Sequence, residues 1–159
     1  MRIGYLCDHP QHLASLARAH VEAFGGLLPK WTQAEAAAEL ESHRERRAIP
    51  TTLVALERGE WLGSASLLQN DHEDIRQYSP WLASLYVRPE ARGRQLGAAL
   101  VGRCVAEAGA LGIACLFLYC TEDLCPWYRR LGWSEHDRIQ LGPLRVVVMA
   151  IDCATETMQ

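Results

Sequence analysis

The sequence predicts a mixed α/β fold. Apolar, strand-like runs alternate with helical patterns in the order β-α-α-β-β-β-α-β-α-β-β. One long helical pattern separates two apolar runs, residues 81–87 and 114–120, and a strand–helix–strand unit of this kind places its strands in parallel with a right-handed crossover. Two turn signals, Arg58-Gly59 and Gly142-Pro143, instead join neighbouring strands as antiparallel hairpins. The sheet should therefore contain both kinds of pairing.

The N-terminal third predicts a short strand followed by two helices. Residues 2–6 read as the strand, and Asp8 is expected to cap a helix that Pro10 begins and that runs to about Phe24, where Gly25-Gly26 ends it. The second helix starts from a capping box.

That capping box is Thr32-x-x-Glu35, a pair in which each side chain can bond the other residue's main-chain N–H. The alanine-rich helix behind it should run to about Arg46. Its charged end is typical of a solvated face.

The remaining elements follow from apolar runs and from glycine or proline at their ends. We expect strands at 51–57, 60–68, 81–87, 114–120, 134–140 and 144–151, and helices at 94–110 and 126–131. Gly112 is a C-terminal stop for the longer helix. We assign residues 1–152 to a single domain and residues 153–159 to a frayed tail.

The composition narrows the function. The chain has 159 residues and a formal net charge of −3, which argues against a main role in nucleic-acid binding. No apolar run approaches the ~18 to 20 residues that a membrane span needs, and no signal peptide is evident. The six cysteines include no Cys-x-x-Cys pair, so we expect no metal and a reducing, cytoplasmic compartment.

The junction between the first strand of the parallel pair, residues 81–87, and the helix that follows it carries the clearest functional signal, at residues 87–100. Gly93 and Gly97 lack a β-carbon, so a ligand can approach the main chain there, and Arg92 and Arg94 add positive charge. N–H groups in the first turn of a helix have no internal partner. Together these features suit a phosphate or pyrophosphate; the alternative is an ordinary helix start with solvated arginines.

Residues 92–97 read Arg-Gly-Arg-Gln-Leu-Gly and follow Val-Arg-Pro at 87–89. This stretch resembles the acyl-CoA pyrophosphate loop of the GNAT superfamily of N-acyltransferases, Gln/Arg-x-x-Gly-x-Gly/Ala after a strand that ends in Val-x-Pro. Gln95 departs from the pattern, which usually has glycine there. Glutamine can still take helical backbone angles, so the N–H groups remain.

A second segment, residues 127–133, reads Trp-Tyr-Arg-Arg-Leu-Gly-Trp. It resembles the GNAT signature aromatic-Tyr-x-x-x-Gly-Phe/Trp, in which the tyrosine faces the thioester sulfur. A phenol of pKa roughly 10 stays protonated at neutral pH and can protonate a leaving thiolate. The resemblance thus makes Tyr128 the candidate general acid; the alternative is a tyrosine that packs a short helix onto the core.

The resemblance implies the GNAT fold, with the sheet splayed between its fourth and fifth strands, and acetyl-CoA as co-substrate. The main chain of 85–87 would bond the pantetheine arm and the acyl carbonyl, with an N–H near Leu85 serving the oxyanion. N–H groups of 93–98 would bond the pyrophosphate, and Thr121 either touches the pantetheine or caps a helix. The implied binding residues are Leu85, Tyr86, Val87, Arg92, Gly93, Arg94, Gln95, Leu96, Gly97, Ala98, Thr121 and Tyr128.

The general base that must deprotonate an ammonium substrate is left open. Glu73 and Asp74 precede the acyl-binding strand, Glu22 lies on the first helix, and a water chain is equally suitable. His20 lies on the apolar face of that helix and is more typical of a core histidine.

The sequence thus predicts an N-acetyltransferase that moves acetyl from acetyl-CoA to a primary amine of a small molecule or peptide, by direct attack in a ternary complex. The alternative is a non-catalytic acyl-CoA sensor, which Gln95 and the missing base favour. Acidic residues at 71–74 suit a cationic acceptor such as a polyamine, an aminoglycoside or a protein N-terminus. We expect no nucleic-acid or membrane partner. A homodimer through the final hairpin is left open.

Overall fold

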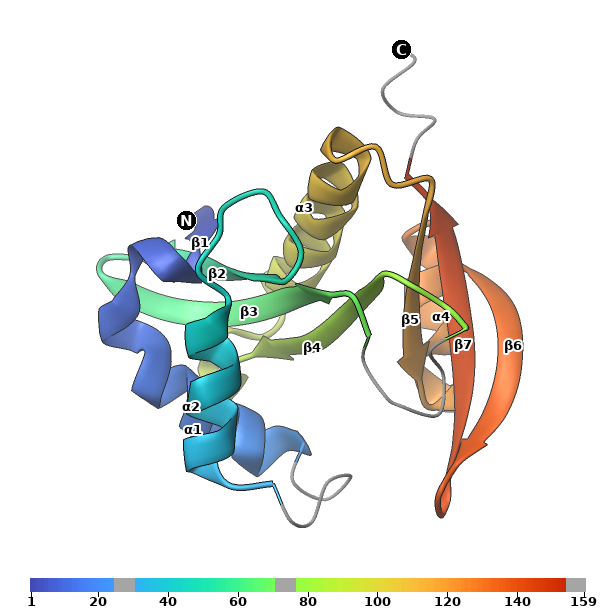
Figure 1. The fold of residues 1–159 in the computed structure, drawn as a ribbon, viewed down its shortest axis with the longest axis horizontal. Coiled ribbons are helices and arrows are strands. Elements are labelled where there is room, and N and C mark those ends of the chain that lie inside the picture. Colours follow the sequence, from blue (N-terminus) through green and yellow to red (C-terminus); the bar gives the residue numbers. More distant parts are fainter. Residues whose placement is uncertain (25–30, 71–76, 154–159) are drawn as a thin grey trace.

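The computed structural model describes residues 1–24, 31–70 and 77–153. Within these ranges the strands form a seven-stranded sheet of order β1-β2-β3-β4-β5-β7-β6, which confirms the predicted mixed α/β fold (Figure 1). All neighbouring strands pair antiparallel except β4 and β5, which are parallel as predicted. The strands are β1 (Arg2–Tyr5), β2 (Thr51–Glu57), β3 (Glu60–Leu68), β4 (Trp81–Val87), β5 (Cys115–Cys120), β6 (Ser134–Leu141) and β7 (Leu144–Asp152).

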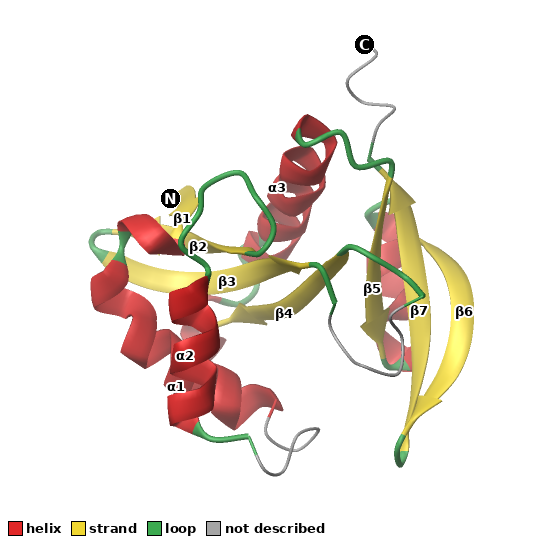
Figure 2. Cartoon of the chain, viewed as in Figure 1, coloured by secondary structure: helices red, strands yellow, loops and turns green. Residues whose placement is uncertain are grey.

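Two helices cover each face of the sheet (Figure 2). Alternate β2 side chains point to opposite faces, so Leu53 belongs to the core cluster that includes α3 and α4, whereas Val54 belongs to the cluster that includes α1 and α2. The helices are α1 (Leu13–Phe24), α2 (Gln33–Ser42), α3 (Leu96–Ala110) and α4 (Cys125–Arg130). Among the described helices, none has the length and apolar character that crossing a bilayer requires.

The parallel pair touches at one end only. In the described residues, β4 and β5 pair at Trp81 and Phe117, and the Phe117 N–H also donates to the carbonyl of Pro80 at 3.0 Å. Further along, β4 carries a bulge against β3, and Ser84 within the bulge has a φ of 55°. The two strands therefore diverge toward their carboxyl ends, where a ligand can enter.

The prediction that Asp8 caps the first helix is wrong. Two short 3₁₀ turns, Leu6–Asp8 and Pro10–His12, precede α1, and neither begins with a side-chain cap. Asp8 instead binds Arg46, with carboxylate and guanidinium 2.6 Å apart. Its preference for an ion pair with a distant arginine could not be read from local sequence. The predicted glycine stop at 25–26 lies outside the described residues.

The capping box of α2 is confirmed, with the N–H of Glu35 donating to Thr32 Oγ1 at 3.1 Å and the reverse bond at 3.0 Å. The helix ends at Ser42, four residues before the predicted Arg46. The reason is His43, which turns inward and whose Nδ1 lies 2.7 Å from Thr52 Oγ1 in the core.

At the C-terminus, β7 ends at Asp152, next to the predicted start of the tail at residue 153. Cys153 is buried, and its N–H donates to the carbonyl of Ala114 at 2.9 Å. Residues 154–159 lie outside the described part of the chain.

Candidate active site

The turn between β4 and α3 leaves a run of main-chain N–H groups unpaired. Gly93 has a φ of 81°, and Gln95 has φ 60° and ψ 24°, so both lie in the left-handed region. Helix α3 consequently begins at Leu96 rather than at Arg94. The N–H of Ala99 donates to the carbonyl of Gln95 at 3.1 Å, whereas the described residues provide no acceptor for the N–H groups of 93–98.

The backbone of this turn is open to a ligand. A Cβ atom placed on Gly93 would meet no atom within 4 Å. The turn lines a cavity of about 920 Å³, here called the loop cavity. Of the predicted binding residues, it is lined by Leu85, Tyr86, Val87, Arg92, Gly93, Gln95, Leu96, Gly97, Ala98 and Tyr128.

The positive charge at the loop cavity differs from the prediction at one residue. Arg92 lines the cavity, with its Nε donating to the carbonyl of Val87 at 3.0 Å. Arg94 turns away and pairs with Glu57 at 2.6 Å, so its guanidinium adds no charge to the cavity. Arg130 of α4, which the sequence did not single out, lines the cavity instead.

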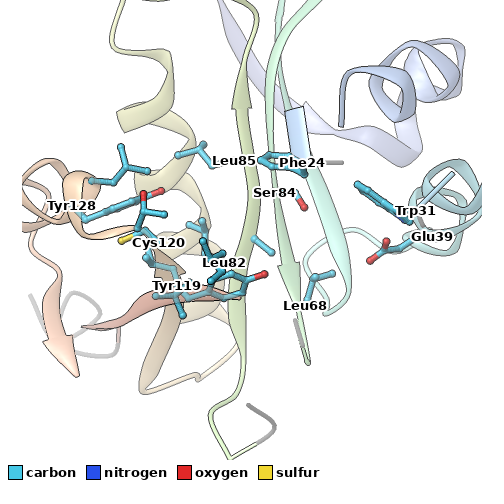
Figure 3. Close-up of a pocket in the computed structure, with 16 residues that line it drawn as sticks. Phe24, Trp31, Glu39, Leu68, Leu82, Ser84, Leu85, Tyr119, Cys120 and Tyr128 are labelled. Carbon is cyan, nitrogen blue, oxygen red and sulfur yellow. The ribbon is translucent and has the colours of Figure 1, made fainter. Parts of the chain in front are cut away.

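A second cavity of about 320 Å³, here called the sheet cavity, lies at the splayed ends of β4 and β5 (Figure 3). Its walls are mostly apolar. It extends to Trp31, which precedes α2, and to Glu39, which lies within α2. Thr121 also lines it and makes no cap bond to the following turn. The two cavities share Phe24, Leu85, Leu124 and Tyr128, and therefore adjoin at these residues.

Tyr128 stands at this junction and is 7% exposed. In Figure 3 its ring projects from α4 into the sheet cavity. Burial, with a smaller contribution from neighbouring Cys120, raises the pKa of Tyr128 above its usual value. Within the described residues its hydroxyl has no hydrogen-bond partner. The arrangement is thus a protonated phenol held at the boundary of two cavities.

The model of the acetyltransferase (GNAT) family matches residues 13–133, more than half of the chain. The chain belongs to the GNAT acetyltransferase family. A comparison with curated proteins gives no match.

Solved structures share the GNAT fold at low sequence identity. Ribosomal-protein-alanine N-acetyltransferase from Brucella melitensis is 22% identical over 96% of this chain and 99% of its own, with a TM-score of 0.75. Aminoglycoside 6'-acetyltransferase type Ii is 18% identical over 96% and 97%, with a TM-score of 0.74. An aminoglycoside 6'-N-acetyltransferase complexed with coenzyme A is 16% identical over 96% and 97%, with a TM-score of 0.69.

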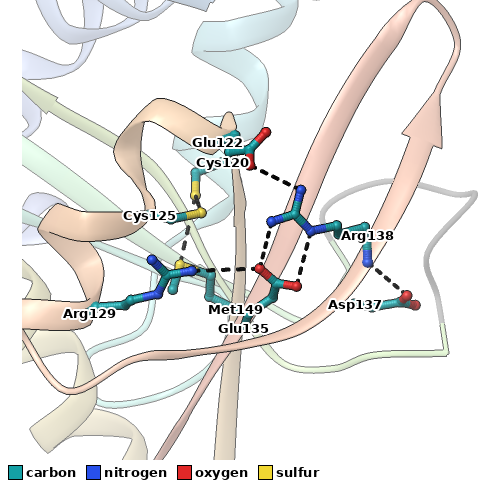
Figure 4. A network of polar contacts seen from close by, with 8 residues as sticks. All are labelled: Cys120, Glu122, Cys125, Arg129, Glu135, Asp137, Arg138 and Met149. Atoms are coloured by element: carbon teal, nitrogen blue, oxygen red, sulfur yellow. Dashed lines mark hydrogen bonds and ion pairs between the residues drawn. The ribbon is translucent and has the colours of Figure 1, made fainter.

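A surface network fixes α4 of this GNAT chain against β6 (Figure 4). Glu135 lies 3.7 Å from Arg129 and 2.9 Å from Arg138, which also reaches Glu122 at 3.2 Å. On the inner side, the rings of Trp127 and Trp133 meet Tyr128 edge-on. Individually, exposed pairs stabilise little, but here they bracket the short helix that orients the phenol.

The candidate bases of the GNAT chain divide into three cases. Glu73 and Asp74 lie outside the described residues. Glu22 is exposed on α1 and lines neither cavity. His20 is buried, with Nε2 3.0 Å from Ser64 Oγ, and burial lowers its pKa to about 4. A water chain therefore stays a candidate, and His20 is a core residue.

The sequence missed Glu39, the carboxylate that does line the sheet cavity. Nothing in its local pattern separates it from the other glutamates of α2. Trp31 also lines the sheet cavity, whereas Trp61 and Trp81 are buried in the core.

Proposed function

We propose that this GNAT protein transfers an acetyl group from acetyl-CoA to a primary amine in a ternary complex. The observation that carries the proposal is the junction of two cavities at Leu85 and Tyr128. One cavity offers unpaired N–H groups and arginines, and the other is apolar. A coenzyme in the first and an amine in the second would bring thioester and nucleophile together at Tyr128.

The loop cavity fits the coenzyme by its chemistry. The N–H groups of 93–98 would bond the pyrophosphate, with the positive end of α3 behind them. Arg92 and Arg130 would add charge, and the open space at Gly93 permits close approach to the main chain. The main chain of 85–87 would accompany the pantetheine arm toward Tyr128. Gln95 keeps this turn because it adopts the left-handed backbone that glycine usually supplies.

Tyr128 would hydrogen-bond the sulfur as negative charge develops there. Its raised pKa keeps the phenol protonated at neutral pH. This phenol is a weaker acid than a thiol, so it does not lose its proton to sulfur without receiving another. The attacking amine releases a proton, which replaces the one that the phenol gives to sulfur. The phenol then serves as donor and relay, and ends each turnover unchanged.

Direct attack of the amine is supported by the protonation state of Cys120. Cys120 lines the sheet cavity, and burial raises its pKa to about 12, so it is protonated at neutral pH. Only a thiolate is an effective nucleophile. Activity that survives iodoacetamide would agree with direct attack of the amine on the thioester. Loss of activity on alkylation of Cys120 alone would contradict it.

The proposal is tested by measuring CoA release from acetyl-CoA with a panel of primary amines. We expect amine-dependent release, matched by acetylated product in mass spectrometry. Stabilisation of the protein by CoA with no release from any amine would refute catalysis and identify an acyl-CoA sensor.

A further inference from the structure

The sheet cavity has an uneven distribution of charge. Its walls are mostly leucine, valine and aromatic side chains, many of them from β3, β4, β5 and β7, with a few uncharged polar side chains such as Ser84 and Thr121 among them. Among the described residues that line it, Glu39 is the single charged side chain. An apolar cavity with one carboxylate selects both the shape and the charge of its ligand.

The carboxylate of Glu39 has no partner within the described residues: it makes neither an ion pair nor a hydrogen bond there. Glu39 remains accessible to solvent, yet loss of water around the carboxyl raises its pKa. His20 and His43 lie with it around a small void, and burial lowers the pKa of both, so neither supplies a positive charge at neutral pH. A cation bound in the cavity would find in Glu39 a carboxylate that no described side chain neutralises.

Glu39 and Tyr128 lie at opposite ends of the cavity in Figure 3, with Leu82 and Leu85 between them. A single ammonium group cannot be at both ends. The group at Tyr128 must be the free amine that attacks the thioester, so the charge at Glu39 must belong to another part of the acceptor.

We propose that the acceptor carries a second cationic group, bound by Glu39, and that an apolar spacer separates it from the reacting amine. This inference rests on the proposed acetyl transfer. A linear α,ω-diamine is the simplest compound with this chemistry. An aminoglycoside fits less well, because its many hydroxyl groups would outnumber the few polar side chains of the lining, which include Ser84, Tyr119 and Thr121.

The test compares hexamethylenediamine with n-hexylamine, which has the same spacer and lacks the second amine. After correction for its two reactive ends, we expect the diamine to have a kcat/KM at least about tenfold higher, as one charge-assisted contact supplies. Glu39→Gln should remove this preference, so that kcat/KM for the diamine falls to the value for n-hexylamine. Glu41→Gln is the matched control, since Glu41 lies on the same helix and pairs with Arg44 at 3.8 Å, outside the cavity.

A charge reversal gives a readout that loss of folding cannot imitate. Glu39→Lys should turn the preference toward ε-aminocaproate, in which a carboxylate replaces the second amine. Equal kcat/KM for diamine and monoamine in the wild type, or equal effects of the Glu39 and Glu41 substitutions, would overturn the inference while acetyl transfer stands. No release with either probe, when other amines react, also overturns it. No release with any amine overturns acetyl transfer itself.

Discussion

Replacing Tyr128 by phenylalanine removes one oxygen atom at the junction of the two cavities. The side chain is 7% exposed, and its hydroxyl has no partner among the described residues. Folding should therefore change by less than about 0.5 kcal/mol, because no protein hydrogen bond is lost. Loss of a donor to charge that develops in the transition state costs about 100- to 1000-fold in kcat, or about 3 to 4 kcal/mol.

The assay is steady-state CoA release, with thermal unfolding and acetyl-CoA binding measured on the same preparation. Tyr78→Phe is the opposite control: the Tyr78 hydroxyl donates to Asp137 at 2.5 Å, away from both cavities. That variant should lose stability and keep its kcat. Undiminished turnover in Tyr128→Phe would refute the role of the phenol, and loss of turnover that follows loss of folding would show a packing role instead.

Three further predictions concern the loop, the core and the charges. Gln95→Gly should raise the unfolding midpoint slightly, since about 1 to 2 kcal/mol of left-handed strain is relieved and about 0.4 to 1 kcal/mol is returned as unfolded-chain entropy; a clearly lowered midpoint would contradict the strain. Burial lowers the pKa of His20 to about 4 from 6.5, so the unfolded chain binds the extra proton and stability falls as the pH drops below 6.5. Urea unfolding should show a loss of about 2 kcal/mol between pH 7.5 and pH 5, smaller in His20→Gln, and an unchanged loss in that variant would assign it to other groups. Arg130→Gln should raise the KM for acetyl-CoA and not for the amine, most clearly at low salt, whereas Arg94→Gln should do so much less because Arg94 is paired with Glu57; equal effects would argue against the distinction.

The order and type of the elements could be predicted because each has a local cause. The strand at 81–87 is observed with its predicted bounds, and the hairpins at 58–59 and 142–143 follow from their turn residues. The errors fall where a distant partner decides. Asp8 prefers Arg46 to a helix terminus, and the contact of His43 with Thr52 ends α2 early.

The open turn at residues 92–97 could also be predicted from the sequence, since the groups that it leaves unpaired belong to the backbone and Gly93 marks where a ligand could approach it. Side-chain direction was not visible. Arg92 and Arg94 look equivalent in the sequence, yet one lines the cavity and the other reaches back to Glu57 of β2. Glu39 and Arg130 enter the two cavities through helix orientation, which depends on packing across the whole sheet.

Because β4 and β5 pair only at Trp81 and Phe117, the hydrogen-bonded ladder of the sheet is nearly interrupted between two groups of strands, β1 to β4 and β5 to β7. An elongated ligand that enters between the diverging strands would take the place of the missing hydrogen bonds and join the two groups of strands. A coenzyme bound as proposed above would then be both a reactant and a bridge between the two groups of strands. We expect amide hydrogen exchange along the facing edges of β4 and β5 to slow when the coenzyme binds, and to recover when the spent coenzyme leaves.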